Sequence, residues 1–234
     1  MKGIKNKLIH AYQQLGPFKN IIWFLILFIS IDFIWKLCID EGNHGDLLLI
    51  FGKDYTWLVE PVNVWTAKVI YWVVHTLFGY ENFMVDGTLV YFQGAFLKFR
   101  IIWECTGVKQ MIMFAILILL YFGPPKKKIW FIPVAMIVLN LINVIRITAI
   151  VFITKEGFPD WFIPFNEWYN GREWDMSQEA YRRFHLDWFE LFHKDVFRWL
   201  YYNGIMFMLW LFWEEIFNIP YQKLKRNKNK NSLT

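Results

Sequence analysis

The chain has 234 residues, of which 56% are hydrophobic, 21% aromatic and only 19% charged, a composition typical of a membrane protein. The net charge of +5 does not indicate a nucleic-acid partner, because the basic residues gather at the ends of apolar segments. The two cysteines, Cys38 and Cys105, are too few for a disulfide-stapled secreted scaffold or a cysteine-rich zinc module.

The first long apolar run extends from Ile21 to Ile39 and follows a group of lysines that ends at Lys19. It is long enough to cross the hydrocarbon core and resembles an uncleaved signal anchor, since no small-residue cleavage site lies near Asp40. The next apolar segment, Trp57 to Phe78, carries a stripe of polar residues. We therefore expect it to form an interfacial or re-entrant helix.

The middle of the chain alternates between turns and apolar runs. Residues Glu81 to Trp103 contain turn signals and alternating side chains, which predict a small β-meander. Three apolar runs follow: the short Gly107 to Phe122, then Ile129 to Ile153, and finally Val196 to Phe217. The loop Lys155 to Phe192 is rich in tryptophan and tyrosine beside charges, as in loops of the headgroup zone.

Lysine clusters predict the orientation of these segments. The N-terminal lysines, Lys126 to Lys128 and the tail from Lys223 onward all belong on the cytoplasmic side by the positive-inside rule. The predicted fold is an all-α integral membrane protein with about four transmembrane helices, an interfacial or re-entrant helix and a small extracytoplasmic β-meander. Residues 1–220 would form one membrane-embedded domain in contact with lipid, and residues 221–234 a disordered basic cytoplasmic tail.

Cys105 stands in a Glu-Cys-Thr-Gly sequence directly before the Gly107 run. It would lie at the outer mouth of a helix, where backbone amides and Lys109 favour a thiolate. Two other interpretations stay open: a small buried side chain, or a disulfide with Cys38, which is also placed at an outer helix end.

Arg146 lies inside the Ile129 run, about 25 Å from the cytoplasmic lysines along a core about 30 Å thick. An arginine within a span is costly and is a functional candidate for that reason. Asn140 and Asn143 share an arc of about 120° with it. The alternative is that Arg146 snorkels to the outer headgroups.

His193 opens the last apolar run at the outer boundary, and His185 lies eight positions earlier. Each could simply be an interfacial residue. Together with Asp187 and Glu190 they could also bind a metal, but the chain lacks paired histidines at the spacing of a zinc motif. The metal signal is therefore weak, and the cysteine mechanism described next implies no metal and no organic cofactor.

The predicted topology brings Cys105, Arg146 and His193 from three segments to one face of the membrane. A nucleophile, a fixed cation and a base in one layer are the groups that cysteine acyl transfer requires. In such a mechanism the thiolate would attack a peptide carbonyl, His193 would carry the proton, and Arg146 would stabilise the oxyanion or orient the substrate.

With these residues the sequence resembles the exosortase/archaeosortase family of multi-pass membrane cysteine transpeptidases. The resemblance runs from about Trp57 to Trp213 and rests on Cys105-Thr106-Gly107, on Asn143-Val144-Ile145-Arg146, and on His193. Family members more often have serine after the cysteine, so Thr106 is a mild departure.

The resemblance implies catalytic residues Cys105, Arg146 and His193, and the supporting residues would be Asn143, Lys109, Thr106 and His185. It also implies an inner-membrane protein with cytoplasmic termini and an extracytoplasmic active site. Its substrates would be exported proteins with a C-terminal transmembrane sorting signal. They would be cleaved through a Cys105 thioester and transferred to a cell-surface acceptor.

A non-catalytic membrane subunit of a secretion or surface-assembly system is the alternative function. In that case Arg146 would pair with Asp32 and Cys105 would only pack. Asp32 and Lys36 stand four residues apart, however, so they can neutralise each other on one helix. A transporter is disfavoured because the chain has no inverted repeat.

Overall fold

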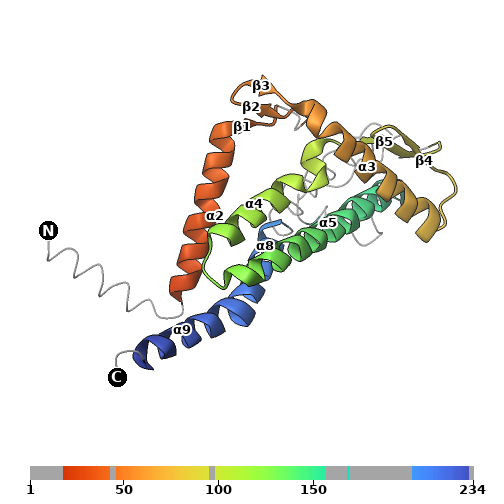
Figure 1. The fold of residues 1–234 in the computed structure, drawn as a ribbon. Coiled ribbons are helices and arrows are strands. Elements are labelled where there is room, and N and C mark those ends of the chain that lie inside the picture. The colour runs from red at the N-terminus through yellow and green to blue at the C-terminus, as the bar shows by residue number, and fades with distance from the viewer. Residues whose placement is uncertain (1–17, 43–45, 95–97, 157–167, 169–201, 232–234) are drawn as a thin grey trace.

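The computed structural model describes residues 18–42, 46–94, 98–156, 168 and 202–231, and Figure 1 shows their arrangement. Helices dominate these residues. They are α2 (Phe18–Cys38), α3 (Glu60–Tyr71), α4 (Val108–Leu120), α5 (Pro125–Glu156), α8 (Gly204–Trp213) and α9 (Ile219–Asn231). The 3-10 turns η1 (Thr56–Leu58) and η3 (Trp103–Thr106) precede α3 and α4, and the π-helical segments η2 (Trp72–Leu77) and η5 (Glu214–Asn218) follow α3 and α8.

Two helices of the described part are long and apolar enough to cross a membrane, α2 and the segment Pro125–Phe152 of α5. On α2 the side chains of Ile29, Phe33 and Leu37 are more than half exposed, as expected of a surface that faces lipid. The helix α4 is apolar but shorter. The fourth predicted run, Val196 to Phe217, is described only from Tyr202 onward, so a count of four spans stays a prediction.

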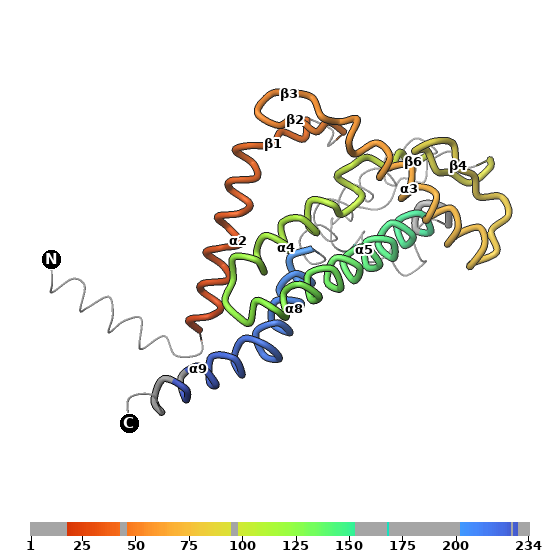
Figure 2. The backbone as a smooth tube through the Cα atoms, in the orientation of Figure 1, coloured from red at the N-terminus to blue at the C-terminus, as the bar shows by residue number. Residues whose placement is uncertain are grey.

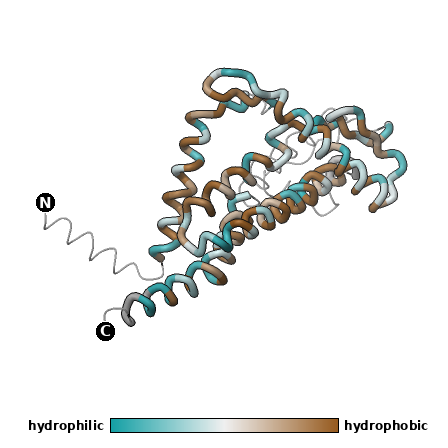
Figure 3. Tube along the Cα trace, viewed as in Figure 1, coloured by the Kyte–Doolittle hydropathy of each residue, from teal (hydrophilic) through white to brown (hydrophobic). Residues whose placement is uncertain are grey.

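The helices α4 and α5 form an antiparallel hairpin, and α2 packs beside α4 (Figures 1 and 2). Aromatic side chains fill the space between these helices and α8. They include Phe24, Phe114, Phe131, Trp210 and Trp213. Figure 3 shows hydrophobic residues along α2, α4 and α5, and hydrophilic ones on α9.

A second apolar cluster lies where α3 and a small sheet pack against the C-terminal half of α5. It contains Ile70 of α3, Phe83 and Val90 of the sheet, and Ile147 and Val151 of α5. The sheet is antiparallel, with strands β4 (Phe83–Asp86), β5 (Leu89–Phe92) and β6 (Lys98–Arg100). These strands fall within the segment that the sequence assigns to a β-meander.

A further three-stranded sheet, β1 (Ile39–Asp40), β2 (Leu49–Ile50) and β3 (Lys53–Asp54), follows α2 directly. The sequence does not predict it, because strands of two residues are too short to show an alternating pattern. The helix predicted over Trp57 to Phe78 is present as η1, α3 and η2. Its position in the membrane interface stays a prediction.

The tail differs from the expectation of disorder over residues 221–234, because α9 is helical from Ile219 to Asn231. A helix that continues from η5 needs no new nucleation, and lysine, arginine, glutamine and leucine are good helix formers. The basic composition of this segment therefore does not prevent it from forming a helix.

Candidate active site

Cys105 lies in the tight turn η3, directly before α4. The N–H of Cys105 donates to the carbonyl oxygen of Ile102 at 2.9 Å, and Thr106 Oγ1 donates to the carbonyl oxygen of Trp103 at 2.6 Å. The chain then enters α4 through Gly107, whose φ of +75° favours glycine. Thr106 is therefore part of the turn itself.

Two side chains of α5 hold this turn from the opposite side. Asn143 Nδ2 donates to the carbonyl oxygen of Cys105 at 2.9 Å, and Arg146 Nη2 donates to the same oxygen at 3.1 Å. The spacing of three residues places both side chains on one face of the helix. Asn143 is fully buried and Arg146 is 3% exposed. Through these hydrogen bonds the structure brings together three residues predicted from the sequence, Cys105, Asn143 and Arg146.

The close approach of α5 also explains Gly107. A Cβ atom at this position would lie 3.2 Å from Asn143 Cγ, which is tighter than ordinary van der Waals contact. Glycine therefore satisfies two requirements, the left-handed backbone and the space that Asn143 occupies.

Tyr202 is a further member of the site that the sequence does not single out. Its hydroxyl donates to Asn143 Oδ1 at 3.0 Å, and its ring centroid lies 4.8 Å from the guanidinium carbon of Arg146. A cation over an aromatic face is stabilised by the ring quadrupole. Tyrosines are common at membrane boundaries, so nothing in the sequence distinguishes Tyr202 from its neighbours.

The buried Arg146 has an unusual environment for a cation. Within the described residues it contacts a carbonyl oxygen and an aromatic ring, and no carboxylate lies in ion-pair distance. Arg146 therefore keeps a positive charge that no acidic partner neutralises within the described part of the chain. Such a group is suited to stabilise negative charge that develops beside Cys105.

Opposing influences set the acidity of Cys105. Burial raises the pKa of its thiol above the usual value, and the positive charge of Arg146 counteracts part of this rise. The thiol is therefore mainly protonated at neutral pH in this state. Attack by its sulfur would need a base to remove the proton.

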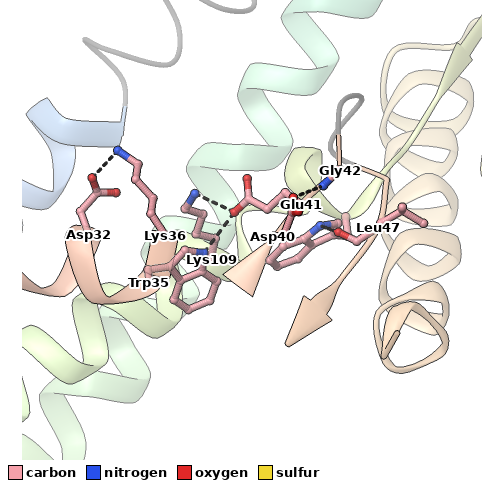
Figure 4. A network of polar contacts seen from close by, with 9 residues as sticks. Asp32, Trp35, Lys36, Asp40, Glu41, Gly42, Leu47 and Lys109 are labelled. Atoms are coloured by element: carbon pink, nitrogen blue, oxygen red, sulfur yellow. Dashed lines mark hydrogen bonds and ion pairs between the residues drawn. The ribbon is translucent and has the colours of Figure 1, made fainter. Parts of the chain in front are cut away.

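The ammonium group of Lys109 is held by Glu41 and not by the thiol of Cys105. Its Nζ lies 2.7 Å from Glu41 Oε1, an oxygen that also accepts a hydrogen bond from Trp35 Nε1 at 3.1 Å (Figure 4). Both charged side chains are mostly buried. The structure thus gives Lys109 a role in fastening the first turn of α4 to the segment that follows α2 and β1.

The same view shows the ion pair between Lys36 Nζ and Asp32 Oδ2, which are 2.6 Å apart (Figure 4). This confirms the prediction that these two residues neutralise each other on the first helix. Asp32 is therefore engaged by its own helix, and Arg146 is engaged at the Cys105 turn.

His185 and His193 lie outside the described residues, and with them the predicted base and the alternative metal site. Within the described part, no group of three or more histidine, cysteine or acidic residues is placed to hold a metal ion. Cys38 and Cys105 are both present as thiols and are not joined by a disulfide.

Comparison with known proteins identifies the family. A family model described as a transmembrane exosortase matches residues 47–169, which is more than half of the chain and includes Cys105, Asn143 and Arg146. No curated protein and no solved structure matches the chain. The match agrees with the resemblance seen in the sequence motifs, and the chain belongs to the transmembrane exosortase family.

Proposed function

We propose that this protein is a membrane-embedded cysteine peptidase or transpeptidase that cleaves a C-terminal sorting segment from exported proteins. The observation that carries the proposal is the convergence of Asn143 and Arg146 on the backbone of Cys105. It places a buried cation beside a cysteine at the start of a helix, in a chain of the exosortase family. These are the groups that stabilise a thiol nucleophile and the oxyanion it creates.

In the proposed reaction the Cys105 sulfur attacks the scissile carbonyl carbon of the substrate. His193 accepts the thiol proton and returns a proton to the leaving amine as the carbon–nitrogen bond breaks. The remaining acyl group is held as a thioester on Cys105. An amine or hydroxyl of a cell-surface acceptor, or water, then attacks the thioester and releases the thiol.

Arg146 would stabilise the tetrahedral oxyanion. Its guanidinium already donates to one carbonyl oxygen, that of Cys105, and donors in a buried site act more strongly than in water. The loss of one such donor typically lowers kcat by about 10²–10³-fold. Arg146 also lowers the pKa of the thiol and so favours its ionisation.

The proposed location of this site is the outer side of the inner membrane, with both termini in the cytoplasm. Lys128 and Arg146 are both on α5, and at about 1.5 Å per residue they lie roughly 27 Å apart along its axis. This is close to the hydrocarbon thickness of about 30 Å. Cytoplasmic lysines at the start of α5 would therefore place Arg146 near the opposite boundary.

Substitution of Cys105 by alanine or serine in living cells tests the proposal. We expect the sorting segments of exported proteins to remain uncleaved, as measured by mass spectrometry of their C-terminal peptides, while the variant stays in the membrane. Cys38→Ser is the matched control and should leave processing intact. Normal processing by the Cys105→Ala variant would refute the nucleophile assignment.

The non-catalytic alternative depended on a pair between Arg146 and Asp32. Asp32 instead binds Lys36, and Arg146 binds the backbone of Cys105. The observed contacts therefore favour the catalytic interpretation.

A further inference from the structure

Five buried side-chain atoms lack hydrogen-bond partners among the described residues, and we single out two that lie on elements packed against the Cys105 turn. One is Oδ1 of Asn63, a residue of α3 that is only 8% exposed. The other is Nε of Arg146, which is 3% exposed. The first atom accepts hydrogen bonds and the second donates one.

Asn63 lies on the buried face of α3, one turn before Ala67 and two turns before Ile70. This face packs against the turn η3 and against α5, the two elements that carry Cys105 and Arg146. Ala67 and Ile70 also belong to the apolar cluster against which Cys105 packs. Both unpartnered atoms are therefore on elements that enclose the Cys105 turn.

Leaving a buried acceptor unpaired costs stability, and most buried polar groups in proteins have a partner. An apolar side chain on this face of α3 would avoid that cost. The buried amide at this position therefore points to a ligand that supplies the missing donor. The same ligand would need an acceptor for Arg146 Nε.

A peptide group carries one N–H donor and one carbonyl acceptor. We infer that Asn63 Oδ1 and Arg146 Nε together form a backbone-binding subsite, which takes one peptide unit of an extended substrate chain beside Cys105. The N–H of this unit donates to Asn63, and its carbonyl oxygen accepts from Arg146. This inference rests on the proposed function, because it assigns the bound chain to the substrate of the same site.

Such a subsite recognises the main chain and no particular side chain. It would hold the substrate in line with the sulfur whatever the sequence at that position, because every peptide unit offers the same two groups. Asn63 is a positioning residue in this scheme, and the chemistry belongs to Cys105.

Two thiol reagents test the inference with the full-length protein in detergent. Iodoacetamide reports the reactivity of Cys105 alone, and a pool of N-acetylated tripeptide chloromethyl ketones reports the same thiol with a peptide backbone attached. The measured quantity is the ratio of the two rates at Cys105. We expect Asn63→Leu to lower this ratio about tenfold, as for the loss of one buried hydrogen bond.

The stability of Asn63→Leu separates binding from a structural role. Because no partner is lost inside the described protein, we expect its unfolding temperature to equal or exceed that of the wild type. Thr66→Val is the matched control. Thr66 shares the buried face, but its hydroxyl donates to Val62 of its own helix at 2.8 Å, so the ratio should not change.

Three results would overturn the inference. They are an unchanged ratio in Asn63→Leu, a fall in the ratio accompanied by an equally clear loss of stability, and a wild-type protein with no preference for the peptide reagent. If Cys105 reacts with iodoacetamide in any of these cases, the nucleophile assignment survives without the subsite. A Cys105 that reacts with neither reagent would refute both.

Discussion

Replacing Asn143 by leucine is expected to loosen the turn that carries Cys105. The amide of Asn143 makes two hydrogen bonds, to the carbonyl oxygen of Cys105 at 2.9 Å and from the hydroxyl of Tyr202 at 3.0 Å. Each contributes roughly 0.5–1.5 kcal/mol, so together they account for about 1–3 kcal/mol of the free energy of unfolding. Leucine keeps the branched shape of asparagine but is larger, so the loss combines these two hydrogen bonds with the fit of two methyl groups in a buried position.

The assay is denaturant unfolding of the purified protein in detergent, followed by tryptophan fluorescence. Asn140→Leu is the matched control, because Asn140 lies one turn earlier on the same helix, is half-buried, and has no side-chain hydrogen bond in the described structure. Both variants gain the same small amount of helix propensity, which cancels in their difference. The control should stay within about 0.5 kcal/mol of the wild type.

A double-mutant cycle with Tyr202→Phe assigns part of the loss to one contact. We expect the effects of Asn143→Leu and Tyr202→Phe to be less than additive by about 1 kcal/mol, because each removes the same hydrogen bond. The reasoning is refuted if Asn143→Leu unfolds like the wild type, or if Asn140→Leu is destabilised by the same amount.

Three other changes probe the same region. Arg146→Gln should shift the pH dependence of iodoacetamide labelling at Cys105 to higher pH, because the guanidinium lowers the pKa of this thiol and offsets part of the rise caused by burial. An unmoved midpoint would contradict this. Gly107→Ala should cost about 1–2 kcal/mol for its left-handed backbone and a further amount for the contact with Asn143. Gly52→Ala has the same backbone cost in open space and is the control. Equal losses of unfolding free energy in the two variants would exclude a cost from the contact. Lys109→Met should cost about 3–5 kcal/mol, since it leaves the mostly buried Glu41 carboxylate without a cationic partner. Lys36→Met breaks an exposed ion pair and should cost at most about 1 kcal/mol. Similar losses in both variants would argue against the role of Lys109 in fastening α4.

The sequence predicts Cys105, Asn143 and Arg146 because polar residues inside or beside apolar runs are costly and therefore conspicuous. The spacing of Asn143 and Arg146 along one helix predicts a common face. In the structure both side chains donate to the carbonyl oxygen of Cys105. The resemblance to exosortases depends on these residues among others, and the family match confirms it.

Contacts between distant parts of the chain could not be predicted in the same way. The sequence predicts that Lys109 faces the thiol, one turn away, but its partner Glu41 is 68 positions earlier, between β1 and β2. Nothing local indicates that these two segments meet. Tyr202 cannot be identified from the sequence for the same reason, since its hydrogen bond to Asn143 spans 59 positions.

The Cys105 turn lies between the two apolar clusters of the described structure. Trp103 belongs to the cluster of α2, α4, α5 and α8. Cys105 packs against the cluster formed by α3, the sheet β4–β6 and the C-terminal half of α5. A shift of either cluster would therefore move the turn. The ion pair of Lys109 on one side and the amide of Asn143 on the other oppose such a shift.

The contacts from α5 reach the carbonyl oxygen of Cys105 and not its sulfur. Every amino acid has this oxygen, so alanine or serine at position 105 keeps both hydrogen bonds and the 3-10 turn. The expected loss of processing in these variants would then report the chemistry of the thiol and not a collapse of the site. Cys105→Ser is the more stringent test of the two variants, because its hydroxyl oxygen has a much higher pKa than the thiol in an otherwise identical turn.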